Sequence, residues 1–585
     1  MLQISAFKRS VIVIGATLLS TQLFAKPIRK NDTTSVPGWP DYLAMGAIGG
    51  PNTQPNVGDD NFNGRPVDAV FKYAGNNGNG DPGVIDPPMN VIRMTNDLDA
   101  VSKNNQHPMR VIMVEYTGQM SGGENFSDFT NSATPNPNQQ DATYIMARHF
   151  ASLIADAQAL QDNPIVYNNT KYYGGMIMNP DLLGAMQQNN YIDQVNNTLR
   201  SNDVNRAVDI ALSLMTQSRT YQNLDPSTDL PWEHPNPYKA QWTGTPYEIL
   251  KKMLQDNYPA WKISSSNDQF WGIGINNEGA AMEKWFLAAV KNPQYDHNAY
   301  HHPQFASNFN GWVQANNWLI RQFAPKNSGV TFGWQENMWS AGSGWWLHKS
   351  MTDSEIQQAY SDPVSQWIST NAPSVVANNA NDTAHSPDFI VFDRYEMDDS
   401  AAPTQATLYN ADSWDNLLTA VGQVSTALNQ SPVMLWQIPG SHLPYQGEAN
   451  PETLPNAPGY VFSTAPVYFF GDDQLKSDLS NLINNPNGAN INQQVGAYAM
   501  PANYNDVGAA YQQYLRHYQG KDSNFDWSKD NKRLQLAAQN HVFAILWGGG
   551  NTTNVIKNFS NTDDHGWLAT KIKDYYKNPV LLSQH

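Results

Sequence analysis

The sequence contains no cysteine, and this absence excludes several kinds of site at once. A chain without cysteine has no disulfide, no zinc–thiolate centre and no cysteine nucleophile. An exported protein of this kind must gain its stability from a large hydrophobic core. A chain of 585 residues that is 40% hydrophobic has the material to build one.

Positive charge is also scarce. The chain has 35 Lys and Arg against 52 Asp and Glu, which gives a formal net charge of -17. Nucleic acids and anionic membranes both require a basic face, so the sequence predicts neither as a partner. A neutral ligand is compatible with this charge, and no motif in the chain indicates a cofactor or a metal site.

No apolar run is long enough to span a bilayer comfortably. The run at 11–19 follows Lys8 and Arg9 and precedes Ala25, which is the pattern of an export signal. We therefore predict a signal peptide over residues 1–25, a secreted or periplasmic mature protein, and no membrane contact after cleavage. The alternative is an uncleaved anchor at the N-terminus.

Short apolar runs recur along the chain, and they read as buried strands. They are 42–50, 110–118, 172–179, 270–278, 330–339, 388–398, 433–440 and 541–550. Most segments between them read as helices: 142–161 and 414–429 have apolar residues at helical spacing, and 353–371 is a helix that Pro363 is expected to break. Strand alternating with helix eight times predicts an α/β fold of the (β/α)₈ or TIM barrel type.

The chain is much longer than a minimal barrel of about 250 residues, so it must carry insertions. We predict a single barrel domain over 26–585, with large insertions after strands three and seven at about 182–265 and 448–540. The segment 51–88 is dense in Gly, Asn and Asp and is expected to form a long loop over the barrel mouth.

The predicted fourth strand ends in Asn276, Asn277 and Glu278. In a barrel of this type, chemistry lies at the carboxyl ends of the strands. The Asn-Glu pair resembles the acid/base position of secreted bacterial (β/α)₈ glycoside hydrolases, in which the Asn contacts a sugar hydroxyl beside the catalytic Glu. The resemblance covers the barrel order and this pair, and it implies that Glu278 is the general acid/base. The alternative is that Glu278 caps a helix beginning near Ala280.

The predicted sixth and seventh strands end differently from each other. That family would place a nucleophilic Glu on strand seven, but the sequence has Gln437, and an amide cannot form a glycosyl ester. Strand six ends in Asp393, Arg394, Tyr395 and Glu396, and alternation puts Asp393 and Tyr395 on one face and the other two on the opposite face. We expect Asp393 or Glu396 to be the nucleophile or the base that activates water. The alternative is a salt-bridge network that closes the barrel rim.

Aromatic and acidic residues at other strand ends complete the predicted site. Glu336 and Glu115 are reserve acids, and tryptophan beside amides and carboxylates suits a sugar, whose ring face stacks while its hydroxyls form hydrogen bonds. The residues expected to hold the sugar are Glu115, Asn277, Trp334, Trp339, Arg394, Tyr395, Gln437 and Trp547.

Together these patterns predict a secreted glycoside hydrolase that cleaves a polysaccharide or oligosaccharide with paired carboxylates at the barrel rim. Two alternatives stay open. One is a barrel that has lost catalysis and binds glycan on its aromatic rim, which is motivated by Gln437 on strand seven. The other is a hydrolase that uses a divalent metal held by rim acids with His348 or His442.

Overall fold

The structure is a computed structural model, and its described residues form the greater part of a barrel and its helices. They are residues 36–49, 62–74, 89–115, 142–188, 203–221, 242–245, 247–248, 301–348, 351–394, 401–402, 405–406, 409–440, 442–443, 445–447, 463–481, 525–548 and 566–584. The predicted signal peptide at 1–25 lies outside them.

Eight parallel strands close into a barrel in the order in which they occur along the chain. They are β1 (Ala44–Ile48), β2 (Ala69–Tyr73), β3 (Val111–Glu115), β6 (Gly175–Met178), β9 (Thr331–Glu336), β10 (Phe389–Asp393), β13 (Val433–Ile438) and β14 (Val542–Trp547). Every residue of these strands is buried, as expected for a sheet covered on both faces. The (β/α)₈ barrel predicted from the sequence is confirmed.

One strand of the barrel was not predicted. The predicted strand at 270–278 lies outside the described residues, and β6 and β9 are hydrogen-bonded neighbours. The missing strand is β2, which lies inside the segment 51–88 that was predicted to be one loop. It has only five residues, and the fourth is Lys72, a charge that argues against a buried strand.

Lys72 is tolerated in β2 because it lies close to a carboxylate. Burial lowers the pKa of Lys72 to about 7, and the nearby charge of Asp97 on helix α2 (Met89–Asn105) opposes this shift. With β2 counted, 172–179 holds the fourth strand rather than the third. The segment at about 182–265 lies between the fourth and fifth strands, β6 and β9, and the segment 448–540 lies between the seventh and eighth, β13 and β14; that both are insertions stays a prediction.

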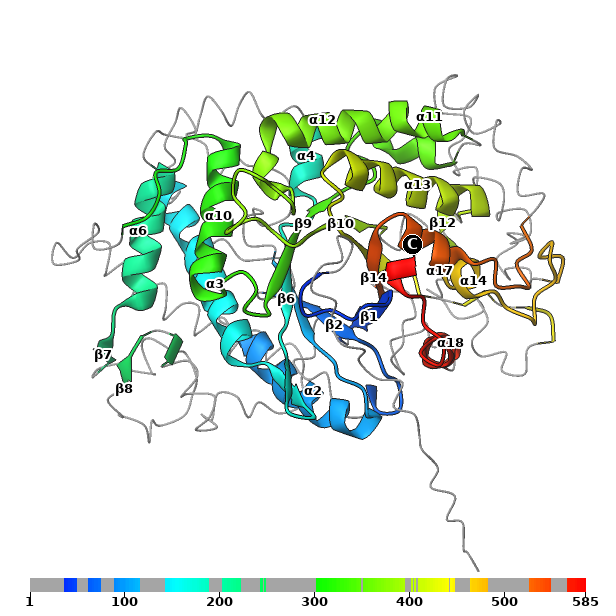
Figure 1. Cartoon of the computed structure of the whole chain (residues 1–585), viewed down its shortest axis with the longest axis horizontal. Helices are drawn as coiled ribbons and strands as arrows, with labels where there is room; N and C mark the ends of the chain where they lie inside the picture. The colour runs from blue at the N-terminus through cyan, green and yellow to red at the C-terminus, as the bar shows by residue number, and fades with distance from the viewer. Residues whose placement is uncertain are drawn as a thin grey trace, which may run out of the picture.

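Helices surround the strands, as Figure 1 shows for α3, α10, α12 and α13. The longer helices are α2, α3 (Ala142–Asp162), α6 (Asp203–Thr216), α10 (Phe309–Phe323), α12 (Asp362–Asn371), α13 (Ala411–Ala427) and α18 (Trp567–Tyr575). The shorter ones are α4 (Leu182–Gln188), α11 (Asp353–Ile356), α14 (Ala465–Phe470) and α17 (Arg533–Gln539). No helix in the described part of the chain is long and apolar enough to cross a membrane.

The predicted break at Pro363 is wrong. The chain stays helical from α11 through a π-helical turn (Gln357–Ser361) into α12, where the proline occupies the first turn. The π-helical turn directly before the proline changes the hydrogen-bond spacing where the proline has no N–H to donate. The predicted helices 142–161 and 414–429 correspond to α3 and α13.

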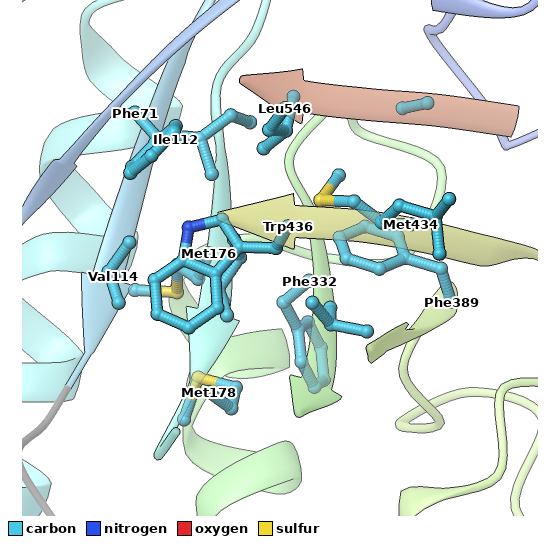
Figure 2. Close-up of a cluster of buried hydrophobic side chains, with 14 of the residues drawn as sticks. Phe71, Ile112, Val114, Met176, Met178, Phe332, Phe389, Met434, Trp436 and Leu546 are labelled. Atoms are coloured by element: carbon cyan, nitrogen blue, oxygen red, sulfur yellow. The ribbon is translucent and has the colours of Figure 1, made fainter. Parts of the chain in front are cut away.

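Strand side chains alternate between the barrel interior and the outer face that the helices cover. Phe71 of β2 lies 6.0 Å from Trp436 of β13, ring centroid to ring centroid, across the interior. Figure 2 shows Trp436 among the buried side chains that include Phe71 and Val114. On the outer face, the Trp334 ring of β9 packs 5.8 Å from Trp312 of α10. This alternation decides which polar residues reach the mouth of the barrel.

Asp68, immediately before β2, joins the two ends of the barrel sheet. One carboxylate oxygen accepts the Tyr42 hydroxyl at 2.7 Å and lies 3.0 Å from His107 Nε2. The other accepts the Met45 backbone N–H at 2.9 Å and the Tyr576 hydroxyl at 2.7 Å. Burial alone would raise the pKa of Asp68, but the bonds from His107, Tyr42 and Met45 hold it below its ordinary value.

We predict that Asp68→Asn lowers the free energy of unfolding by about 2–4 kcal/mol near neutral pH, because an amide presents its own N–H to groups that must donate. The depressed pKa means that the contribution of the carboxylate is present above about pH 4 and is lost as the pH falls through the native value. Urea unfolding at pH 7 and pH 3.5 measures this.

Asp574→Asn is the matched control. Asp574 pairs with Lys577 at 2.6 Å on the surface, where it is 58% exposed, so its loss should change stability by less than about 1 kcal/mol. Equal effects of the two substitutions would contradict a special role for Asp68.

Candidate active site

Asp393 is the acidic residue that the structure places inside the carboxyl end of the barrel. It ends β10, and its Oδ1 accepts a hydrogen bond of 2.6 Å from the Gln335 side-chain amide of β9. Both residues lie on the interior face, since Gln335 alternates with the outward-facing Trp334. Asp393 is 9% exposed, so its carboxylate is nearly enclosed.

Asp181 joins this pair from the end of the fourth strand. The Gln335 side-chain oxygen accepts the Asp181 backbone N–H at 2.6 Å, so one amide group links Asp181 to Asp393. The Asp181 carboxylate accepts the Asn337 side-chain amide at 2.8 Å and is partly exposed. Asn179 and Asp181 have φ values of 42° and 68°, in the left-handed region that Asn and Asp tolerate best among non-glycine residues.

Gln437 faces the interior because β13 is irregular at this point. The pairing of β13 with β14 passes from Leu435–Ile545 to Ile438–Trp547, so β13 holds one residue more than its partner. Gln437 has a φ of 54°, which costs roughly 1–2 kcal/mol for a residue of this kind. Its amide donates to the Tyr73 hydroxyl of β2, and the Trp436 ring lies 6.2 Å from the Tyr73 ring. The bulge therefore turns two consecutive side chains toward Tyr73.

Two hydrogen-bonded groups, Tyr73 with Gln437 and Asp393 with Gln335, Asp181 and Asn337, lie at this end of the barrel, and we call them together the mouth network. It offers two carboxylates, three side-chain amides and a phenol. Such groups donate to and accept from several neighbouring hydroxyls, and a carboxylate is also a base or a nucleophile. The arrangement is therefore suited to a ligand rich in hydroxyl groups.

Asp393 and Gln437 are among the residues predicted from the sequence, whereas Asp181 and Tyr73 are not. Tyr73 is absent because β2 lies in a segment predicted to be a loop. Asp181 is absent because the acid of the fourth strand is predicted at Glu278. The fourth strand in fact leads into Asn179, Pro180 and Asp181. An acid directly after a buried strand and before a helix was the available signal.

Glu336 does not face the mouth. It is fully buried on the outer face of β9, where Oε1 accepts the Asn337 backbone N–H at 3.0 Å. Among the described residues, its Oε2 has no hydrogen-bond partner. Burial raises the pKa of Glu336 to about 8, and bonds from Ser340 and Asn337 oppose this only in part. Glu336 is thus a buried, protonated carboxyl group behind the rim, away from the position that the predicted catalytic acid would occupy.

Other predicted site residues also face the helices. The Trp334 indole donates to Asn317 of α10 at 2.9 Å, and the Trp547 ring packs 5.7 Å from Phe469 of α14. The Arg394 guanidinium lies 4.4 Å from the centre of the Tyr409 ring, just before α13. These three side chains stabilise the contact between barrel and helices, so they do not form the expected sugar platform.

The remaining predicted residues fall into two groups. Glu115 ends β3, is fully buried, and lies by alternation on the outer face beside the interior Val114, while Trp339 is partly exposed in the turn after β9. Asn277, Glu278, Tyr395 and Glu396 lie outside the described residues, so their predicted roles stay predictions.

A metal centre receives no support from the described part of the chain, where no three His, Asp or Glu residues are grouped to hold an ion. His442 lies with Nε2 3.6 Å from Asp472 Oδ2 and its ring 5.2 Å from Trp567. One imidazole and one carboxylate fall short of the three protein ligands of a catalytic zinc site.

Comparison with known proteins adds little. No protein-family model matches the chain, and no curated protein matches it in sequence. Among solved structures, the chain is similar to the catalytic domain of beta-amylase from Paenibacillus polymyxa, at 10% identity, with 93% of this chain and 99% of that chain covered. The TM-score of 0.26 is too low for this likeness to support an argument, so the fold assignment depends on the strand order described above.

We predict that Glu336→Gln removes a pH dependence of stability. A carboxyl group whose pKa is raised by folding favours the native state at low pH, and this contribution is lost as the pH rises from about 4.3 toward 8. Relative to the wild type, the variant should gain roughly 2–4 kcal/mol in the free energy of unfolding between pH 5 and pH 8.5.

Urea unfolding at the two pH values tests this, with Glu355→Gln as the control. Glu355 is exposed, and bonds from Thr352 lower its pKa, so it stays ionised over this range and its variant should parallel the wild type. Parallel curves for Glu336→Gln and the wild type would show that Glu336 is already ionised at pH 5.

Proposed function

We propose that this protein is a glycoside hydrolase whose active site is the mouth network. The observation that carries the proposal is the inward-facing Asp393 carboxylate of β10, which Gln335 of β9 links to the Asp181 backbone after β6. Glycosidic bond cleavage needs two carboxyl groups on either side of the bond, and these two residues provide a pair at the rim of the barrel. No Glu at strand seven is then required.

The two carboxyl groups have different roles in this proposal. Asp393 is nearly enclosed and acts as the nucleophile or as the base that activates water. Asp181 is partly exposed, so it exchanges protons with solvent and donates one to the departing sugar oxygen. Gln335, Asn337 and Gln437 hold sugar hydroxyls through their amides, and Trp436 with Tyr73 gives an apolar surface for a ring face.

The substrate is a neutral polysaccharide or oligosaccharide, in keeping with the amides of the mouth network and the acidic chain. We also propose that residues 1–25 direct export, because an enzyme that acts on a polymer outside the cell must leave the cell. Glu278 and Glu396 remain candidate acids from the sequence, and the test below includes them.

We predict that Asp393→Asn and Asp181→Asn each reduce kcat by about 10²–10⁴-fold, because an amide neither attacks carbon nor transfers the proton. The measurement is release of reducing ends from a panel of plant, fungal and bacterial glycans. Asp574→Asn, on an exposed helix far along the chain, is the control and should retain full activity.

The same panel distinguishes the alternatives. If Asp393→Asn and Asp181→Asn are fully active while Glu278→Gln or Glu396→Gln is inactive, Asp393 and Asp181 are not the catalytic pair. The protein is then still a glycoside hydrolase, with its acids elsewhere. If wild-type protein sediments with an insoluble glycan but releases no reducing ends, the barrel binds glycan without cleaving it. Activity that is lost with a chelator would instead support the metal-dependent hydrolase.

A further inference from the structure

A cavity of about 390 Å³ opens at the amino-terminal end of the barrel, opposite the mouth network. Its wall consists of residues that directly precede five of the barrel strands. The lining residues are Pro37, Gly38, Trp39, Pro40, Tyr42, Asp68, Pro108, Arg110, Thr170, Lys171, Tyr172, Tyr173, Asn327, Ser328 and Gly329. This face of a barrel usually serves stability rather than chemistry, so the proposed glycosidase does not use the cavity.

Arg110 gives the cavity a positive charge that the protein only partly satisfies. The residue is 4% exposed, and its guanidinium lies 4.4 Å from the centre of the Trp39 ring. The Gly38 carbonyl accepts one of its N–H groups at 2.7 Å, while its Nε has no partner among the described residues. A guanidinium has five N–H donors, so this one retains capacity for an acceptor that the chain does not supply.

The nearby carboxylate of Asp68 does not fill that capacity. Each of its oxygens already has two neighbouring groups, and none of the four belongs to Arg110. Burial lowers the pKa of Arg110, and the charge of Asp68 opposes the shift from a distance. Arg110 Nε therefore lacks an acceptor among the described residues, in the wall of this cavity.

The rest of the wall combines prolines and aromatic rings with polar residues such as Asn327 and Ser328. Three prolines and the rings of Trp39, Tyr172 and Tyr173 face the space, and Lys171 adds an exposed positive charge at the edge. Three charged side chains, Asp68, Arg110 and Lys171, line the cavity among apolar groups. A volume near the lower end of the range for ligand sites, with a largely apolar wall and a few charged groups, is the pattern of a site for a small organic molecule. Carboxylate matches a guanidinium in geometry, since two parallel N–H···O bonds can form.

We propose that this cavity binds a small organic carboxylate, with the carboxylate on Arg110 and a flat apolar body between the tyrosines and prolines. Occupancy stabilises the amino-terminal face of the barrel, because the ligand touches segments before β1, β2, β3, β6 and β9 together. The site is independent of the mouth network and of any sugar chemistry there.

The test is calorimetric titration of the full-length protein with 4-hydroxybenzoate, compared with the neutral 4-hydroxybenzamide of the same shape. We expect the carboxylate to bind at least tenfold more tightly, since a hydrogen-bonded charge pair is worth about 1.5–3 kcal/mol. Arg110→Gln should abolish this preference. Equal binding of the two compounds, or no binding of the carboxylate at about 10 mM, overturns the proposal.

A surface variant guards against misfolding of Arg110→Gln. Thr170 is an exposed lining residue on the hairpin of β4 (Ile165–Tyr167) and β5 (Thr170–Tyr172), so Thr170→Trp should block the cavity and reduce affinity at least tenfold. Val166 lies on the same hairpin, is 43% exposed and does not line the cavity, so Val166→Trp should bind normally. Unchanged binding in Thr170→Trp places the ligand elsewhere and contradicts the proposal.

Discussion

The closure of the sheet between its first and last strands is the constraint on which the other features depend. β1 pairs with β14 in parallel, and the Asp68 carboxylate holds the adjacent ends together through Tyr42 near the start and Tyr576 near the end. Closure leaves no free sheet edge, and it brings all eight carboxyl ends to one rim. The mouth network exists because β6, β9, β10 and β13 meet there.

Alternation along the strands then separates polar residues that are neighbours in sequence. Gln335 enters the interior and holds Asp393, whereas the next residue, Glu336, is enclosed behind the wall and is held protonated by burial. One residue of register thus distinguishes a side chain inside the barrel from a side chain behind its wall. The bulge in β13 breaks the alternation once, and it does so where Gln437 must turn toward Tyr73.

Sequence patterns predicted the barrel because its strands are apolar runs with few charges, and helices such as α3 have clear periodicity. They failed at β2, where a buried Lys72 depends on Asp97, a tertiary contact that no local pattern reports. That one omission shifted the strand count, so Asp181, which follows the fourth strand of the barrel, is absent from the predicted residues. Composition identified tryptophans such as Trp334 and Trp547 as candidates, but only packing against α10 and α14 reveals that they face the helices.

The pairing of the first strand with the last also affects how the protein is made. Ala44 is the register partner of Ala544, and Tyr42 forms a bridge with Leu581, so these contacts join the most distant parts of the described chain. A ribosome delivers residues in order, and the first strand must wait for nearly the whole polypeptide before its partner exists. Until then one edge of the growing sheet stays open, and contacts of such long range form slowly. The nascent chain therefore has a long period in which a chaperone can hold it unfolded.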